Sequence, residues 1–244
     1  MSTTPIAPSL QPGALPERRR VPRIMPLDID VRPASEAPPA ATLQQLKAQP
    51  RKPGEASFFF FDHHFQHNAL KVLPGEYFVA QEPLAIMTVL GSCIAACLWD
   101  SRMRVGGMNH FMLPEGDSAD ASGRYGSYAM ELLINEMMKL GARREHMQAK
   151  VFGGGQVMHS FTTMNVGERN TAFVLEYLQT ERIAVVSKDV LDIHPRKVCY
   201  LPHSGKAMVK RLASANTEAL AAQERAAAAR TAPAASTGGS VDLF

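Results

Sequence analysis

Two apolar runs on either side of a polar Asp-Ser-Arg turn predict a β-hairpin near the middle of the chain. The first run covers residues 94–99, and the second covers residues 105–113 and includes a glycine pair. A loop centred on this turn pairs Cys93 directly with His110 across the two strands. An odd loop or a bulge would instead make the thiol and the imidazole diagonal neighbours.

Further short apolar runs and two helical patterns extend the prediction of ordered structure from residue 58 to residue 212. Apolar residues recur at helical spacing over 125–140 and 170–179. Mixed strands with two helices predict an α/β (α+β) fold, a layered mixed β-sheet sandwich with two main helices in a single domain. Strands are expected at 69–73, 76–80, 84–90, 148–152 and 183–187, followed by a final hairpin over 197–201 and 207–212.

Both ends of the chain differ in composition from this central part. Residues 1–57 are rich in Pro, Ala and Arg with little periodicity, which predicts a disordered arm because such a segment buries too little apolar surface to offset its chain entropy. Residues 213–244 form an Ala-rich tail, in which a helix over 216–230 is expected. The predicted domain therefore spans residues 58–212.

Composition limits the class of protein. The chain has 244 residues, 45% of them apolar, and a net charge of only +3, which indicates an ordinary globular protein and not a nucleic-acid-binding one. Three cysteines are too few and too far apart for a disulfide framework, so we expect a reducing cytoplasm. We find no signal peptide and no apolar run approaching the ~20 residues that cross a bilayer.

Cys93 and His110 are the candidate catalytic pair. Directly opposed residues of two antiparallel strands hold their Cβ atoms roughly 4.5–5.5 Å apart, so a histidine there can take the proton of a thiol. Thr88 precedes the cysteine on the previous run, and its hydroxyl can hold the other ring nitrogen. Each residue also has an ordinary alternative: a space-filling cysteine, a hydrogen-bonded core histidine and a β-branched strand residue.

Other conspicuous residues favour structural roles. Cys97 and Cys199 are expected to pack in the core. The histidines at 63, 64 and 67 lack further ligands at suitable spacing, so we predict no metal. Gly153–Gly155 has neither the Lys-Ser/Thr of a P-loop nor a dinucleotide fingerprint, and tight backbone packing near a site is the better interpretation. In the helix start at 167–170, Asn170 is expected to cap and Arg169 to pair with an acidic group.

Four motifs in this order resemble the chemoreceptor glutamine deamidase family CheD over residues 58–212. They are Thr88-Val89-Leu90-Gly91-Ser92-Cys93, the run Gly-Gly-Met-Asn-His-Phe-Met-Leu-Pro at 106–114, Lys150-Val151-Phe152-Gly153-Gly154-Gly155, and Asn165-Val166-Gly167-Glu168-Arg169-Asn170. The resemblance implies hydrolytic deamidation of glutamine side chains to glutamate on methyl-accepting chemotaxis receptors, which regulates adaptation. It also implies Cys93 as nucleophile, His110 as base and Thr88 as the orienting residue.

The implied mechanism proceeds through a thioester on the cysteine and uses no metal or cofactor. Backbone N–H groups from Gly91 to Cys93 are the expected oxyanion donors, and we expect Gly91, Ser92 and Asn109 to contact substrate. An alternative is a non-catalytic binding partner of receptors or of the chemotaxis phosphatase CheC. Transglutamination, or cleavage of an amide bond in another target, is a third possibility.

Overall fold

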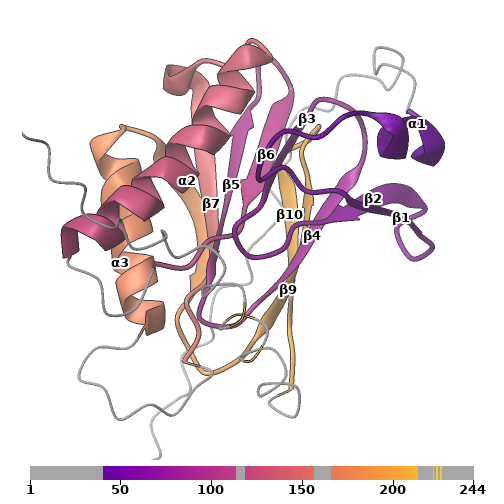
Figure 1. Ribbon diagram of the computed structural model, residues 1–244. Coiled ribbons are helices and arrows are strands. Elements are labelled where there is room, and N and C mark those ends of the chain that lie inside the picture. Colours follow the sequence, from indigo (N-terminus) through magenta and orange to yellow (C-terminus); the bar gives the residue numbers. More distant parts are fainter. Residues whose placement is uncertain are drawn as a thin grey trace, which may run out of the picture. The chain divides into compact units, whose positions relative to one another are not determined.

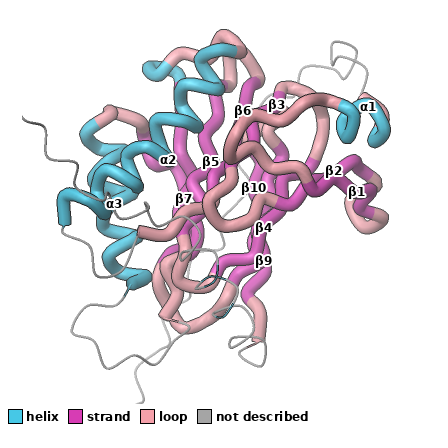
Figure 2. The backbone as a smooth tube through the Cα atoms, in the orientation of Figure 1, coloured by secondary structure: helices cyan, strands magenta, loops and turns pink. Residues whose placement is uncertain are grey.

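The computed structural model describes residues 41–113, 119–156 and 166–213, together with Ala222, Glu224 and Ala226 (Figures 1 and 2). Its helices are α1 (Leu43–Ala48), α2 (Ala119–Lys139) and α3 (Val166–Thr180). Its strands are β1 (Phe58–Asp62), β2 (His67–Lys71), β3 (Tyr77–Ala80), β4 (Ala85–Leu90), β5 (Ile94–Asp100), β6 (Val105–Asn109), β7 (Met147–Gly153), β8 (Ala184–Val190), β9 (Arg196–Leu201) and β10 (Lys206–Arg211).

The strands form two five-stranded mixed sheets. The first sheet has the order β1-β2-β4-β9-β10, and the second has the order β3-β6-β5-β7-β8. Most neighbours are antiparallel, whereas β2 pairs with β4 and β7 with β8 in parallel. The predicted fold class, a layered mixed-sheet sandwich with two main helices, is confirmed.

The layers follow from where the apolar side chains lie. One core joins the two sheets, with Leu70 and Ile86 from the first sheet and Phe78 and Met108 from the second. A second core lies between the β5/β7 sheet and helices α2 and α3, which cover the outer face of that sheet in Figure 1. Strand β5 is therefore buried on both faces, which explains why its sequence is a continuous apolar run and not an alternating one.

The predicted pairing within the β5–β6 hairpin is wrong by two residues. Trp99 pairs with Gly106, and the same offset continues along the hairpin, so Cys93 and His110 do not face each other directly. The reason is the loop at 101–104. The Asp100 carboxylate accepts hydrogen bonds from the backbone N–H groups of the second and third loop residues, and the fourth has a positive φ, which moves the turn along the chain.

An even shift keeps every side chain on its own face of the sheet. Cys93 belongs to the core between the two sheets, as do Met108 and Met112, which lie two residues to either side of His110. The thiol and the imidazole are thus diagonal neighbours on the inner face of the second sheet. They enter the space between the two sheets, where Thr88 of β4 also lies.

The ordered structure begins earlier than the predicted boundary at residue 58. Thr42 caps α1 in a reciprocal pair of hydrogen bonds with Gln45, and Leu46 and Ala56 are buried in the core between the sheets. The rest of the predicted arm, and most of the tail at 213–244, lie outside the described residues. Within that tail, Ala222, Glu224 and Ala226 are helical.

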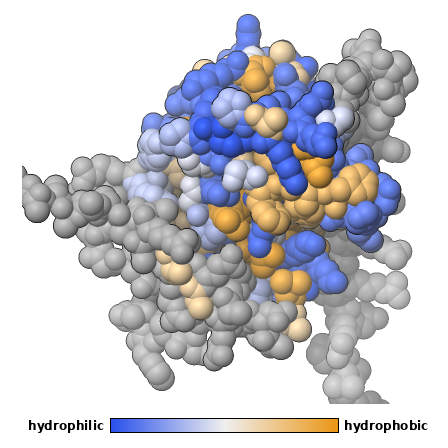
Figure 3. Space-filling model, turned by 45° about the vertical axis from the view of Figure 1, so that its right-hand side comes forward, coloured by the Kyte–Doolittle hydropathy of each residue, from blue (hydrophilic) through white to orange (hydrophobic). Residues whose placement is uncertain are grey.

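Figure 3 brings the side with α1 and β1 forward and shows apolar surface between hydrophilic regions. Phe58 and Phe61 of the edge strand β1 are 60% and 41% exposed, respectively, and add to the apolar surface of the protein. No helix within the described ranges is long and apolar enough to cross a membrane.

Candidate active site

Thr88 holds the imidazole of His110 in one orientation. The Thr88 Oγ1 atom lies 2.8 Å from His110 Nδ1 and 2.8 Å from the carbonyl oxygen of Val72. A carbonyl oxygen can only accept and a hydroxyl has one proton, so Thr88 donates to Val72 and accepts from Nδ1–H. The hydrogen-bond network thus assigns the ring proton to Nδ1 and leaves the Nε2 lone pair free.

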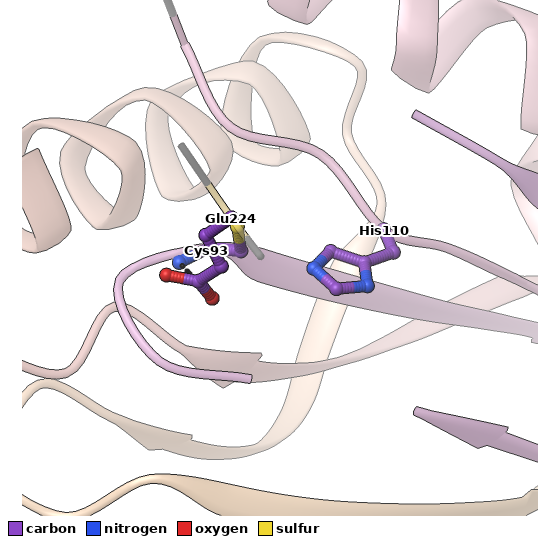
Figure 4. Close-up of side chains that lie close together, drawn as sticks. All are labelled: Cys93, His110 and Glu224. Carbon is purple, nitrogen blue, oxygen red and sulfur yellow. Dashed lines mark hydrogen bonds between the residues drawn. The ribbon is translucent and has the colours of Figure 1, made fainter. Parts of the chain in front are cut away.

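The sulfur of Cys93 lies near the other end of this ring. Cys93 Sγ, a ring nitrogen of His110 and a carboxylate oxygen of Glu224 lie within 4.8 Å of one another, and all three residues are buried. Figure 4 shows the imidazole extending toward Cys93 and Glu224, with one nitrogen facing them and the other facing away. Within the described part of the chain, His110 Nε2 has no hydrogen-bond partner, so it is available to a thiol or a substrate.

Both members of this pair are neutral in the structure at neutral pH. Burial raises the pKa of the Cys93 thiol well above its usual value, and the nearby charge of Glu224 raises it further. Burial lowers the pKa of His110 to about 4, against a smaller opposing effect of Glu224. The resting state is therefore a thiol beside a neutral imidazole, and transfer of the proton must accompany attack on a substrate.

The lowered pKa of His110 predicts a loss of stability in acid. Between pH 6.5 and about 4, the unfolded chain binds a proton at this histidine that the folded protein does not. The free energy of unfolding should therefore fall as the pH drops through this window, by on the order of 2–3 kcal/mol near pH 4.5. Urea unfolding of the wild type and His110→Gln at both ends of the window measures this change, because the variant lacks the proton uptake of His110 and keeps the carboxylates of the wild type. Identical pH profiles would contradict the assignment.

Four donors from the loop before β5 converge on the carboxylate of Glu224. One carboxylate oxygen accepts from the backbone N–H groups of Gly91 (2.7 Å) and Cys93 (3.4 Å). The other accepts from the backbone N–H and the hydroxyl of Ser92, at 3.0 and 2.8 Å. These groups form an anion site beside the thiol, at the place where the sequence analysis expects oxyanion donors.

The glycine turn at the end of β7 holds the loop that precedes β5 in place through backbone hydrogen bonds. The N–H groups of Gly154 and Gly155 donate to the carbonyls of Cys93 and Gly91, at 2.8 and 2.7 Å. Gly153 has a φ of +110°, and a Cβ atom there would lie 2.1 Å from the Cys93 carbonyl oxygen. Only glycine fits this close approach, so the predicted tight backbone packing is confirmed.

Asn170 is a supporting residue whose role the sequence analysis missed. Its side chain accepts from the N–H of Leu113 and donates to the carbonyl of Ser92, both at 2.9 Å, and it is fully buried. The predicted capping role is wrong, because α3 begins at Val166 and Asn170 lies inside the helix. This asparagine instead ties α3 to the anion-binding loop.

Asn109, predicted to contact substrate, points away from the site. Its side chain accepts from the N–H of Ala96 and donates to the carbonyl of Ala129 in α2, at 3.1 and 3.0 Å. Neighbouring residues of a strand alternate between faces, so His110 points between the sheets while Asn109 points toward the helices. Gly91 and Ser92, the other two predicted contacts, both lie at the anion site.

The only group of described residues whose metal-binding atoms come together is Cys93, His110 and Glu224. The oxygens of Glu224 already accept hydrogen bonds from N–H and O–H donors. Such donors stabilise a bound anion and disfavour a cation at the same place. The exposed histidines at 63, 64 and 67 are not part of this group. Cys97 and Cys199 are buried in apolar clusters, in keeping with a packing role.

Glu224 could not have been identified from the sequence. It lies among alanines in the C-terminal tail, 131 residues after Cys93, and no motif distinguishes it from Glu218 in the same segment. Only the folded arrangement places its carboxylate on the loop that precedes β5.

Comparison with known proteins adds independent information. Residues 112–211 match the family model CheD, described as CheD chemotactic sensory transduction. The chain is 72% identical over 202 residues to a probable chemoreceptor glutamine deamidase CheD 1 from Albidiferax ferrireducens, covering 83% of this chain and 86% of the relative. Proteins named probable chemoreceptor glutamine deamidase CheD are 50% identical in Thiobacillus denitrificans (78% of this chain, 96% of the relative) and 48% identical in Methylobacillus flagellatus (81% and 100%).

Proposed function

This chain belongs to the CheD family, and we propose that it hydrolyses selected glutamine side chains of methyl-accepting chemotaxis receptors to glutamate. The observation that carries the proposal is the position of the Glu224 carboxylate in the site. A glutamate carboxylate, the product group of this reaction, lies on the N–H donors beside a buried Cys–His pair. A glutamine amide has almost the same shape as this carboxylate, and its carbonyl oxygen can accept from the N–H groups of Gly91 and Cys93.

In the first step, Cys93 attacks the side-chain carbonyl carbon of the glutamine. His110 Nε2 takes the thiol proton as the sulfur–carbon bond forms, and it then delivers that proton to the departing nitrogen, so that ammonia leaves. The tautomer imposed by Thr88 supports this role, because Nε2 is the unprotonated nitrogen. Hydrogen bonds between catalytic groups commonly shorten only when the substrate is bound.

The second step hydrolyses the thioester. His110 removes a proton from water, the hydroxide adds to the acyl carbon, and the thiol regains its proton as the glutamate is released. A small cavity bordered by Val72, Val89 and His110 adjoins the ring. In both steps the negative charge on the tetrahedral oxygen faces the N–H groups of the loop that precedes β5, which supports their role as the oxyanion hole.

The proposed substrate lies on the cytoplasmic helices of the receptors, where thiols stay reduced. A binding role without catalysis, toward receptors or the phosphatase CheC, remains the alternative that the family resemblance raises. The variant Cys93→Ala separates the two, because it removes the chemistry and leaves the surface intact.

The direct test is incubation of the purified protein with a cytoplasmic receptor fragment. We expect ammonia release and a gain of about one dalton at particular glutamines, whereas transglutamination would give an adduct and proteolysis a shortened peptide. A fragment whose glutamines stay unchanged would contradict the proposal, whether or not the fragment binds. Changes that occur equally with Cys93→Ala would remove the cysteine from it.

Thr88 is a positioning residue, and its replacement by valine should slow the reaction moderately. Valine keeps the shape but removes the hydroxyl that holds Nδ1, so we expect kcat to fall by about 10–100-fold with little change in KM. The carbonyl of Val72, 3.4 Å from Nδ1, retains part of the orientation. The matched variant Thr88→Ser keeps the hydroxyl and should retain most activity. Equal kcat values for the valine and serine variants would show that the hydroxyl does not orient the ring.

A further inference from the structure

We propose that the C-terminal segment around Glu224 is an intramolecular product mimic, which occupies the active site and competes with the receptor glutamine. This inference rests on the proposed function for its meaning. That the segment occupies the active site is inferred from the contacts of the Glu224 side chain alone. Glu224 is only 1% exposed, although it comes from a tail that follows the last strand of the sandwich.

The contacts are those that a reaction product would make. Both carboxylate oxygens are engaged, one by the N–H groups of Gly91 and Cys93, and the other by the N–H and hydroxyl of Ser92. A buried carboxylate is stable only when donors or cations replace its water, and here the donors belong to the loop that carries the nucleophile. Cys93 and His110 complete the surroundings of the carboxylate (Figure 4).

Residues 222, 224 and 226 of the segment are helical. Ala222 and Ala226 lie two positions to either side of Glu224, and both are exposed. In a helix, positions two residues away lie on nearly the opposite side, so the buried side chain of Glu224 enters the site while Ala222 and Ala226 stay outside it. A receptor helix that presents a glutamine must enter in the same way, which makes the two ligands mutually exclusive.

Occupancy by Glu224 also makes the nucleophile less reactive. Its negative charge and its hydrogen bond to the thiol both oppose ionisation of Cys93, in addition to the effect of burial. The bound segment therefore blocks the oxyanion donors and keeps the sulfur protonated. Release of the segment frees the donors and removes the contribution of Glu224 to the raised pKa of the thiol.

The first test measures access to the thiol and does not depend on any deamidase activity. Iodoacetamide should alkylate Cys93 at least about tenfold faster in full-length Glu224→Ala than in the wild type, since a site occupied nine-tenths of the time leaves a tenth of the molecules open. Peptide mapping separates this site from Cys97 and Cys199, which are buried in the core. The matched variant Glu218→Ala, in the same Ala-rich segment, should react like the wild type.

A synthetic peptide spanning residues 213–231 should slow the alkylation of Cys93 in Glu224→Ala. The same peptide with alanine at position 224 should not. Equal alkylation rates in the wild type and Glu224→Ala would overturn the inference, whatever the activity of the protein on receptors. Acceleration in Glu218→Ala as large as in Glu224→Ala would also overturn it, because the effect would then be general to the tail.

The second test uses the reaction. In Glu224→Gln, the carbonyl oxygen of the side-chain amide should accept from the N–H groups of Gly91 and Cys93, and the amide should be converted in cis. Cys93 Sγ would bond to the side-chain carbon, ammonia would leave with the thiol proton, and water would cleave the thioester to restore glutamate and thiol. We expect a gain of about one dalton at residue 224, and no gain when Cys93→Ala is added.

Kinetics with a receptor fragment complete the test. Glu224→Ala should lower KM about tenfold and leave kcat unchanged, as expected when a competing segment is removed. If the wild type converts receptor glutamines, but Glu224→Gln leaves its own glutamine unchanged, the product-mimic inference fails and the proposed function stands. If neither protein releases ammonia from the fragment, the proposed function fails, and the alkylation experiment still decides whether the segment occupies the site.

Discussion

Replacement of Cys93 by alanine is expected to abolish ammonia release from a receptor fragment, lowering kcat/KM by at least about 10⁴-fold. The sulfur is the group that forms the acyl intermediate in the proposed mechanism. Without it, His110 and the N–H donors can only bind the amide. The effect should appear in kcat, because the backbone donors of Gly91 and Ser92 stay in place. Circular dichroism and thermal unfolding should confirm that the variant folds.

Cys97 provides a matched control for this experiment. It lies four residues later in the same strand, faces the same core, and has no imidazole within its described contacts. Burial raises the pKa of its thiol far above the usual range. Cys97→Ala should lose about 1 kcal/mol of stability and retain deamidation. Loss of activity in Cys97→Ala with full activity in Cys93→Ala would exchange the roles of the two cysteines and refute the proposed site.

Replacement of His110 by glutamine is expected to reduce kcat by about 10³-fold. Glutamine is polar and of similar size, so it can hydrogen-bond to Thr88, yet it cannot accept the thiol proton or protonate the departing ammonia. Steady-state ammonia release at saturating receptor fragment measures the loss. The surface variant His63→Gln makes the same chemical change at an exposed position and should be indistinguishable from the wild type. An undiminished kcat in His110→Gln would remove the histidine from the mechanism.

Most elements of the fold could be predicted from the sequence because their patterns are local. The runs that form β4, β5, β7 and β9 are apolar and bounded by turn residues, and α2 and α3 show helical spacing. The aromatic run of β1 was not recognised as a strand. The predicted start of the domain was also too late, because α1 contributes one buried leucine that a sequence pattern does not reveal.

The candidate site could be predicted in part. The hairpin pattern predicts that Cys93 and His110 lie close together. It does not predict the exact register of the two strands, because the register depends on the hydrogen bonds that the Asp100 carboxylate accepts from the backbone of the loop at 101–104. An error of two residues does not change the face of the sheet to which a side chain points, so the two side chains still lie close together. For Asn109 the prediction ignored the alternation of a strand, and its side chain proved to bind α2.

Interactions between distant segments could not be predicted at all. Asn170 reaches the loop before β5 from α3, and Glu224 reaches it from the tail. Neither contact leaves a pattern in the sequence around either partner. They depend on how the two sheets and the covering helices are arranged, which is a property of the whole fold.

Deamidation in water enriched in oxygen-18 tests the central claim most directly. If the Cys93 thioester is hydrolysed, each converted receptor glutamine gains one heavy oxygen and becomes about three daltons heavier, with ammonia released in equal amount. The wild type should give this product, and Cys93→Ala should leave the fragment unchanged. Heavy glutamate formed equally by Cys93→Ala, or conversion by the wild type without incorporation of the heavy oxygen, would contradict the account.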